Sequence, residues 1–431
     1  MTPTHADTAV VVDPQTYVTG PPLAALARLR DTSPAVWVDE PDGPGFWLVL
    51  RHADVQRVLK DPATFSSWLG ATQVRDAADL PFARRMMLNL DPPDHARLRR
   101  LLTRSFTPRA VATLTAAIEA SAAGLVDRVL AGPDVVDVAR DVAADLPLLT
   151  LAEVLGVPAP DRWLTYDWSN RVIGWQDPDY AVSARFDGSG GTDLARQAVA
   201  LRPHPGPDGA MPDPRTAEGM PDLYGYARLL AEHKRAHPGD DVMSVLLAQV
   251  DEGGAISDAE FESMFWLFAV AGNETLRNGL PGGLIALLEH PTAMAELRAD
   301  PSLLPGAVEE MLRWWTPVMV FRRTATTDVE LAGVPVRARD KVVVSFTSAN
   351  RDPSVFADPD AFDVRRSPNP HLTFGHGPHF CLGAQLARVQ MRALFGQLLS
   401  RTTSLEPAGE PALLRSSFQR GVKRLPVRWT A

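Results

Sequence analysis

The chain of 431 residues contains a single cysteine, Cys381. One thiol allows no intrachain disulfide, and no zinc or iron–sulfur site made of several thiolates of the chain. Gly375, Gly377 and Pro378 precede Cys381 and favour a tight, irregular loop. Gly383 follows it and opens a run with helical spacing of apolar residues. The thiol is therefore expected just before a helix N-terminus, where backbone N–H groups and the helix dipole favour a thiolate.

Three interpretations of this cysteine are open from the residues alone. It could be an inert buried thiol, or a nucleophile if His376 or His379 serves as its base. It could also be an axial thiolate ligand of haem iron, for which one cysteine suffices. In that case the glycines would let the backbone approach the porphyrin.

The loop pattern Phe374-x-x-Gly377-x-x-x-Cys381-x-Gly383 resembles the haem-binding loop of the cytochrome P450 monooxygenases. The resemblance extends over about residues 36–427. It implies haem b as cofactor, Cys381 as the iron ligand, and Phe374 and Gly383 next to the haem. It also implies O2 as co-substrate, with electrons from a ferredoxin and a ferredoxin reductase that are separate proteins.

Ser257 and Glu260 form a capping-box pattern ahead of a long apolar run, which predicts a helix over about 258–289. The run contains Ala271-Gly-Asn-Glu-Thr275. By resemblance this helix crosses the distal haem face, with Ala271 beside the haem, Thr275 at the oxygen site and Glu274 relaying protons. The alternative is structural: the glycine permits close packing and Thr275 bonds back to a carbonyl.

Pro281 lies inside the same predicted helix and is followed by two glycines. A proline removes one backbone hydrogen bond and clashes with the preceding turn. We therefore expect a kink or a break near Leu280.

His95 and Arg99 are four residues apart, so both would project from one side of a helix and suit a carboxylate. By resemblance they would bind the haem propionates together with Arg323 and His379. Arg322 is the adjacent alternative to Arg323. The competing interpretation is that these are solvated surface groups.

Glu310 and Arg313 are three residues apart and can pair on one helix face. They resemble the E-x-x-R motif of the family, and Arg366 resembles its second arginine. The three would form a structural lock behind the haem loop, with a role in stability and none in catalysis.

Strand-like segments occur at both ends of the chain and helical patterns between them. The predicted fold class is α+β, predominantly helical, with small β-sheets. By resemblance it is a cytochrome P450 fold with the haem between the distal helix (about 258–289) and the cysteine loop. Motifs from Asp91 to Arg388 must converge on one cofactor, which predicts a single domain over 1–431. The Gly/Pro-rich segment 186–222 is expected to be a lid insertion within it; a linker is the alternative.

The formal net charge of −9 argues against nucleic-acid binding. No signal peptide and no uninterrupted apolar run of about 18 residues is evident, so a cytoplasmic protein without a membrane span is expected. Arg97, Arg100, Arg104 and Arg109 are either a solvated helix face or a docking patch for an acidic redox partner.

The resemblance places mostly apolar side chains around the substrate, which favours a hydrophobic small molecule. Finer likenesses, including Asn273 before Glu274, point to a subgroup acting on sterols, terpenoids and branched lipids. The predicted reaction is hydroxylation or epoxidation of such a compound or of a secondary-metabolite intermediate. Oxidative coupling or desaturation is the alternative, and a non-catalytic haem binder is disfavoured. The expected pocket residues are Met86, Met87, Phe268, Val318, Val320 and Phe418.

Overall fold

A computed structural model describes residues 5–41, 43–72, 74–76, 79–181, 190–207, 209–251 and 256–430. Helices dominate, as predicted. Their bounds are α1 (His5–Val12), α2 (Leu23–Thr32), α3 (His52–Lys60), α4 (Leu80–Ala83), α5 (Asp94–Thr103), α6 (Pro108–Leu130), α7 (Val138–Asp141), α8 (Asp145–Leu155), α9 (Trp163–Ile173), α10 (Pro178–Ala181), α11 (Asp193–Val199), α12 (Pro221–Ala236), α13 (Val242–Asp251), α14 (Asp258–Glu289), α15 (Pro291–Ala299), α16 (Leu304–Trp315), α17 (Phe346–Ala349) and α18 (Ala384–Arg401).

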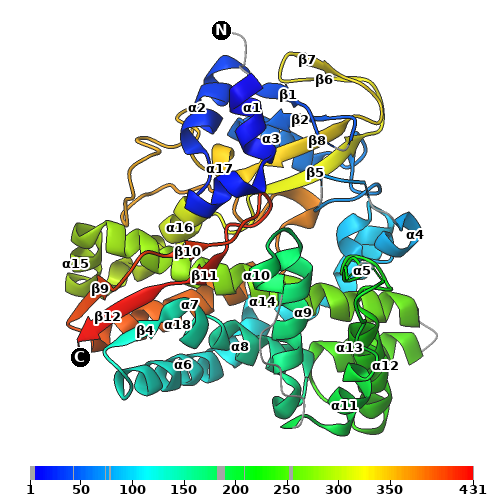
Figure 1. Cartoon of the computed structure of the whole chain (residues 1–431), viewed down its shortest axis with the longest axis vertical. Coiled ribbons are helices and arrows are strands. Elements are labelled where there is room, and N and C mark those ends of the chain that lie inside the picture. Colours follow the sequence, from blue (N-terminus) through cyan, green and yellow to red (C-terminus); the bar gives the residue numbers. More distant parts are fainter. Residues whose placement is uncertain are drawn as a thin grey trace.

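The strands are short and form several small sheets, so the α+β class predicted from the sequence is confirmed. The largest sheet has the order β1-β2-β8-β5-β3, with β2 parallel to β8 and the other neighbours antiparallel. It joins the N-terminal strands to the segment after α16 at one end of the molecule (Figure 1). Bounds of the strands are β1 (Ala35–Val38), β2 (Phe46–Val49), β3 (Phe65–Ser66), β4 (Val135–Asp137), β5 (Val320–Ala325), β6 (Val329–Leu331), β7 (Val334–Val336), β8 (Lys341–Ser345), β9 (Ser404–Pro407), β10 (Ala412–Leu413), β11 (Val422–Arg424) and β12 (Pro426–Thr430).

Helix α14 crosses the middle of the molecule between the sheet end and the helical end (Figure 1). It begins at the predicted capping box: Ser257 accepts from the N–H of Glu260, and the Glu260 side chain accepts from the N–H of Ser257. The predicted break near Leu280 is wrong, because the helix continues through Pro281 to Glu289.

Close packing around the proline explains why the helix survives it. A Cβ on Gly282 would lie 2.2 Å from the Trp315 ring of α16, and one on Gly283 would lie 2.9 Å from Phe395 of α18. The glycines thus admit two neighbouring helices to the α14 backbone. The packing of α16 and α18 against α14 offsets the loss of the backbone hydrogen bond that Pro281 cannot donate.

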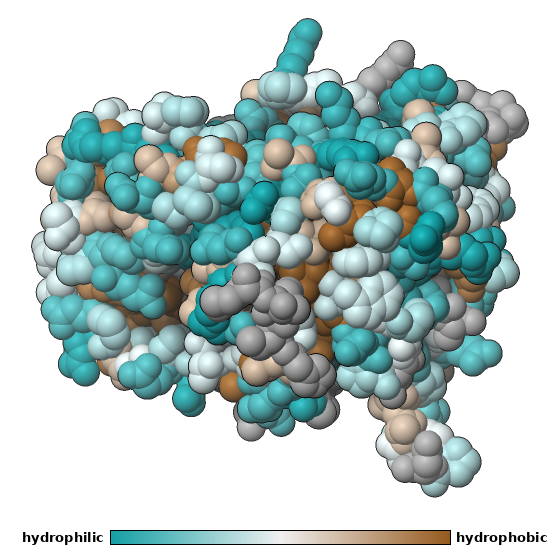
Figure 2. Space-filling model, turned by 90° about the horizontal axis from the view of Figure 1, so that it is seen from above, coloured by the Kyte–Doolittle hydropathy of each residue, from teal (hydrophilic) through white to brown (hydrophobic). Residues whose placement is uncertain are grey.

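One large hydrophobic cluster draws buried residues from α5 to β12, including α6, α8, α12, α14, α16 and α18. Two smaller clusters lie on the sheet. The sheet end, seen from above, is mainly hydrophilic with a hydrophobic strip across its middle (Figure 2). Helix α6 is long and apolar enough to cross a membrane by length and composition alone. It packs against α18 and α8 with Ile118, Leu125 and Val129 buried, and it exposes charged residues such as Glu119 on its other side.

The segment 186–222 contains α11 and the start of α12 within its described part, 190–207 and 209–222. Residues 186–189 and 208 lie outside the described residues. Thr192 caps α11 and also donates to Asp161, which ties the helix to the turn before α9. The expected lid function of the segment stays a prediction.

Candidate active site

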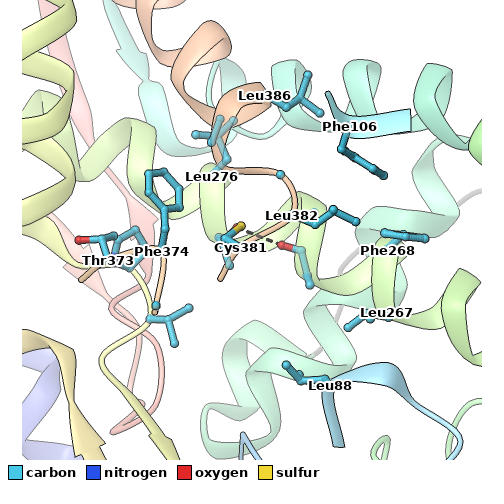
Figure 3. A pocket seen from close by; sticks show the side chains of 18 of the residues that line it. Leu88, Phe106, Leu267, Phe268, Leu276, Thr373, Phe374, Cys381, Leu382 and Leu386 are labelled. Carbon is cyan, nitrogen blue, oxygen red and sulfur yellow. Dashed lines mark hydrogen bonds between the residues drawn. The ribbon is translucent and has the colours of Figure 1, made fainter. Parts of the chain in front are cut away.

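A cavity of about 260 Å³ lies between α14 and the segment around Cys381. Apolar side chains from α8, α14, α18 and β5 line most of it, together with Cys381, Thr275, and His95 and Arg99 of α5. Figure 3 shows Cys381 in the middle, with Phe374 on one side and Leu382 on the other, and with Leu267, Phe268 and Leu88 farther along the wall.

The loop around Cys381 has the shape that its glycines predicted. Gly375 and Gly377 adopt positive φ of 73° and 70°, and a Cβ on Gly377 would lie 2.5 Å from the Leu59 carbonyl oxygen. The Cys381 N–H donates to the carbonyl of Phe374 at 2.8 Å, and α18 begins at Ala384. The backbone is thereby fixed on both sides of Cys381.

The exposed surface of Cys381 faces the cavity that it lines. Burial by the surrounding protein raises the pKa of the thiol. The Gly383 N–H and the positive charges of Arg99 and Arg388 oppose that rise, because they stabilise a thiolate. The thiol therefore needs a further cationic partner to ionise at neutral pH.

His95, Arg99 and His379 line the same cavity. The two imidazole rings lie with centroids 4.1 Å apart. Burial and the neighbouring arginines lower the pKa of His95 to about 4 and that of His379 to about 2. Burial likewise lowers the pKa of Arg323 to about 10. These groups form a buried, electropositive cluster that a nearby anion would stabilise.

Two buried polar atoms of this cluster have no hydrogen-bond partner among the described residues, His95 Nε2 and an Arg323 guanidinium nitrogen. Buried polar atoms without hydrogen-bond partners are costly. The nearby Asp91 carboxylate already accepts from Ser66 and Ser67. The cluster therefore fits a cofactor that brings its own carboxylates, such as the two propionates of haem.

Strand alternation separates the two candidate arginines of β5. Arg322 donates to the Asp76 carboxylate at 2.7 Å and to the carbonyls of Val74 and Arg75. Arg323 points to the other side of the strand, where its charge lowers the pKa values of His95 and His379. Of the two, Arg323 belongs to the cluster.

Helix α14 presents Ala271, Gly272 and Thr275 to the cavity. The Thr275 hydroxyl donates to the carbonyl of Ala271 at 2.9 Å, the back-bond that the structural interpretation expected. A Cβ on Gly272 would lie 2.9 Å from Leu151 of α8, so this glycine also allows close packing.

Glu274 is fully buried and does not line the cavity, although the sequence predicted that it relays protons to the oxygen site at Thr275. Its carboxylate accepts from Tyr180 of α10, from Arg277 at 3.1 Å and from Asn278 at 2.8 Å. Arg277 also donates to Asn170. The acid is thus held on the α9 and α10 side of the helix, and no contact of Tyr180 or Arg277 with Glu274 was expected from the sequence.

Glu310, Arg313 and Arg366 come together behind the cysteine loop, as the motif predicted. Arg313 forms a bidentate pair with Glu310 (2.7 Å and 2.7 Å) and donates to the carbonyls of Asn350, Pro359 and Ala361. Arg366 Nε contacts both carboxylate oxygens of Glu310 at 3.1 and 3.2 Å. Glu310 and Arg313 are fully buried.

Among the expected pocket residues, Met87, Phe268 and Val318 line the cavity. Met86 does not line it and packs against the large hydrophobic cluster. Val320 and Phe418 line a second cavity of about 330 Å³ beside the sheet. Phe418 stacks on Phe321, which does line the first cavity, with ring centroids 6.3 Å apart.

The fold and the site together define a class: a helical α+β protein with a mostly apolar cavity that joins one thiol to a cluster of arginines and histidines. A family model described as "Cytochrome P450" matches residues 227–418. The steroid C26-monooxygenase of Mycolicibacterium smegmatis is 36% identical over 95% of this chain and 91% of its own length. The methyl-branched lipid omega-hydroxylase of Mycobacterium tuberculosis is 37% identical over 94% of this chain and 90% of its own length. The Mycobacterium marinum cytochrome P450 CYP268A2 in complex with pseudoionone superposes with a TM-score of 0.81 at 34% identity, covering 94% of each chain.

The chain belongs to the cytochrome P450 family. It is a haem-thiolate monooxygenase with haem b as its cofactor, and it acts on hydrophobic substrates with O2 and redox partner proteins. The α+β fold, the enzyme class and the cofactor predicted from the sequence are thereby confirmed.

Proposed function

We propose that Cys381 is the axial ligand of the haem iron and that His95, Arg99, Arg323 and His379 bind its propionates. The observation that carries this assignment is that the one thiol of the chain shares a cavity with His95, Arg99 and His379, and that Arg323 is near enough to lower the pKa values of both histidines. Because haem brings two carboxylates, it would pair the partnerless atoms of His95 and Arg323. Phe374, Gly383 and Ala271 would contact the haem, since all three line the cavity.

When bound, the haem supplies the activation of O2. Thr275 has a hydroxyl on the cavity side of α14, so we infer that it holds a proton or a water molecule at the reaction site. Glu274 has its carboxylate behind the helix, where it pairs with Arg277, and we infer that it is the inner end of a proton path. Protons would pass between Glu274 and the cavity across the α14 segment that also carries Thr275.

The substrate class that we propose is a large apolar molecule of the steroid or methyl-branched lipid kind, hydroxylated at an aliphatic carbon. Leu88, Leu267, Phe268, Val318 and Phe321 make an apolar wall that would exclude water and hold such a molecule by burial. The two relatives named above act on molecules of this kind.

We further propose a ferredoxin, reduced by a ferredoxin reductase, as the electron donor in the cytoplasm. Arg99 of α5 donates to the Phe380 carbonyl at 2.6 Å, which brings α5 against the cysteine loop. Phe380 is exposed there, and Arg100 and Arg109 are exposed on the same stretch of chain. Arg97 already forms an ion pair with Glu260, and the Arg104 side chain lies outside the described residues. An acidic partner would thus dock against Phe380, Arg100 and Arg109.

The iron-ligand proposal is tested by the reduced-CO spectrum of the haem-loaded enzyme. We expect a Soret band at the position of thiolate ligation, and its loss in Cys381→His with haem retained. A thiolate-type band in that variant would refute the assignment. Titration with steroids and branched lipids should shift the iron from low to high spin, and mass spectrometry should find a hydroxylated product. Turnover with no added oxygen atom in any product would refute hydroxylation.

The docking proposal is tested by Arg100→Glu. We expect slower reduction by ferredoxin at low salt, an effect that weakens as salt rises. Arg337→Glu is a matched control, because Arg337 is an exposed arginine on the β6–β7 side of the sheet end. Equal reduction rates of Arg100→Glu and wild type at low salt would refute the docking face.

A further inference from the structure

An ion pair outside the proposed haem contacts lies directly behind Phe374. Arg388 of α18 and Glu309 of α16 form two parallel hydrogen bonds, both 2.7 Å long. His371 Nε2 lies 3.1 Å from the same carboxylate. Glu309 precedes the lock residue Glu310 but takes no part in the lock, since its partners are Arg388 and His371.

The pair has a definite orientation relative to the cysteine loop. The Arg388 guanidinium carbon lies 4.5 Å from the centre of the Phe374 ring, a cation–π contact. Phe374 lines the cavity, and its carbonyl accepts from the Cys381 N–H. The cation is therefore the end of the pair that faces the sulfur, and Glu309 is the remote end.

Both charges are permanent at working pH. Burial alone would raise the pKa of Glu309, but the hydrogen bonds from Arg388 and His371 lower it to about 2. Arginine stays protonated in proteins. Both side chains are about three-quarters buried, so solvent screens this pair less than it screens surface pairs.

We propose that Arg388, oriented by Glu309, is a positioning residue that sets the reduction potential of the haem-thiolate centre. The inference rests on Cys381 being the iron ligand. Reduction adds one electron, supplied by the ferredoxin, and leaves Arg388 and Glu309 in the same protonation state. The reduced centre is more negative by one charge, so a cation near the sulfur stabilises it and an anion destabilises it.

Opposite effects of the two partners follow from this orientation. Arg388→Gln removes the cation and leaves the Glu309 carboxylate, so reduction should become about tenfold less favourable, or about 59 mV for a one-electron couple. Glu309→Gln leaves an uncompensated cation and should shift the potential in the positive direction. Arg388→Lys keeps the charge and should return most of the way to wild type. The double variant should lie between the single variants.

The test is a redox titration of the substrate-free, haem-loaded enzyme, with the reduced-CO spectrum recorded for every variant. Arg365→Gln is the matched control: Arg365 pairs with Glu296 at 2.9 Å, and the two side chains are 56% and 41% exposed. It should leave the potential unchanged. The conservative variants Glu309→Gln and Arg388→Lys carry the test if Arg388→Gln fails to fold.

Opposite shifts of Arg388→Gln and Glu309→Gln, with thiolate-type spectra retained, would support the proposal. Shifts in the same direction, or shifts no larger than that of Arg365→Gln, would overturn it and leave the pair as a tie between α16 and α18. A wild-type spectrum without the thiolate band would instead refute the ligand assignment on which the proposal rests.

Discussion

Glu310→Gln should destabilise the protein more than any surface charge substitution, because it neutralises the centre of the lock. The Glu310 carboxylate accepts from Arg313, Arg366, the N–H of Asp363 and Asn369 Nδ2. Glutamine keeps the shape of the side chain, but its NH2 group is a hydrogen-bond donor and would replace one of the two oxygens that accept from these groups. Two buried guanidinium groups would also lose their counter-charge.

The expected loss follows from burial. Breaking a fully buried ion pair by neutralising one partner costs about 3–5 kcal/mol, since an uncompensated charge stays behind. Unfolding entropy of about 2.1 cal/mol/K per residue gives about 0.9 kcal/mol/K for a chain of 431 residues. Glu310→Gln should therefore lower Tm by about 3–6 °C. Glu296→Gln, which breaks the exposed pair with Arg365, should cost about 0–1 kcal/mol and about 1 °C or less.

Thermal unfolding of the haem-loaded proteins at one fixed haem concentration measures the difference, because bound haem itself adds stability. The dependence of stability on pH in the acidic range gives an independent check. Burial raises the pKa of Glu310, but its hydrogen bonds lower the pKa by more than burial raises it, so the pKa lies below its ordinary value. The stability from this carboxylate is therefore present above the ordinary pKa and is lost as pH falls through the lowered one. Glu310→Gln should lose less stability than wild type on acidification. A Tm loss equal to that of Glu296→Gln would refute the reasoning.

Three further predictions concern the cavity and its walls. Thr275→Ala should keep substrate binding but lower the product formed per O2 consumed, whereas Thr275→Ser should keep that yield. Equal yields in all three proteins would contradict the assigned role. Gly282→Ala should cost about 1–3 kcal/mol, because its Cβ would lie 2.2 Å from the Trp315 ring; the matched Gly279→Ala meets its nearest neighbour at 3.5 Å and should cost less in urea denaturation. The pKa of His95 is lowered to about 4, so the unfolded chain takes up a proton here that the folded protein does not. As pH falls from the ordinary pKa of about 6.5 to about 4, the free energy of unfolding of the haem-free protein should therefore decrease by about 1.4 kcal/mol per pH unit through this residue. His95→Gln should flatten that part of the curve, and an unchanged slope would count against the buried cluster.

Local sequence patterns determined several features directly. The capping box at Ser257 and Glu260 set the start of α14, because both hydrogen bonds close within one turn. The glycines before Cys381 set the irregular loop, because positive φ is accessible to glycine at little cost. Each of these features depends on residues within a few positions of one another, and the pattern therefore carries it.

Long-range contacts decided the rest. Glu274 and Thr275 are adjacent in sequence, yet one faces a buried network with Tyr180 and the other faces the cavity. The direction of Glu274 depends on where α9 and α10 pack, which no spacing within α14 specifies. The survival of α14 through Pro281 is likewise a tertiary effect, because neighbouring helices pack against the glycines that follow the proline.

The sequence by itself determined the chemistry that is available: one thiol, two histidines and two arginines suited to a carboxylated cofactor, and a hydroxyl on a long apolar helix. Only the tertiary structure decided which groups share the cavity. It selected Arg323 over Arg322 by strand alternation, and it placed Arg388 behind Phe374. The physical reason is that residue type sets what a group can bind, whereas packing between distant elements sets its neighbours, its burial and therefore its charge state.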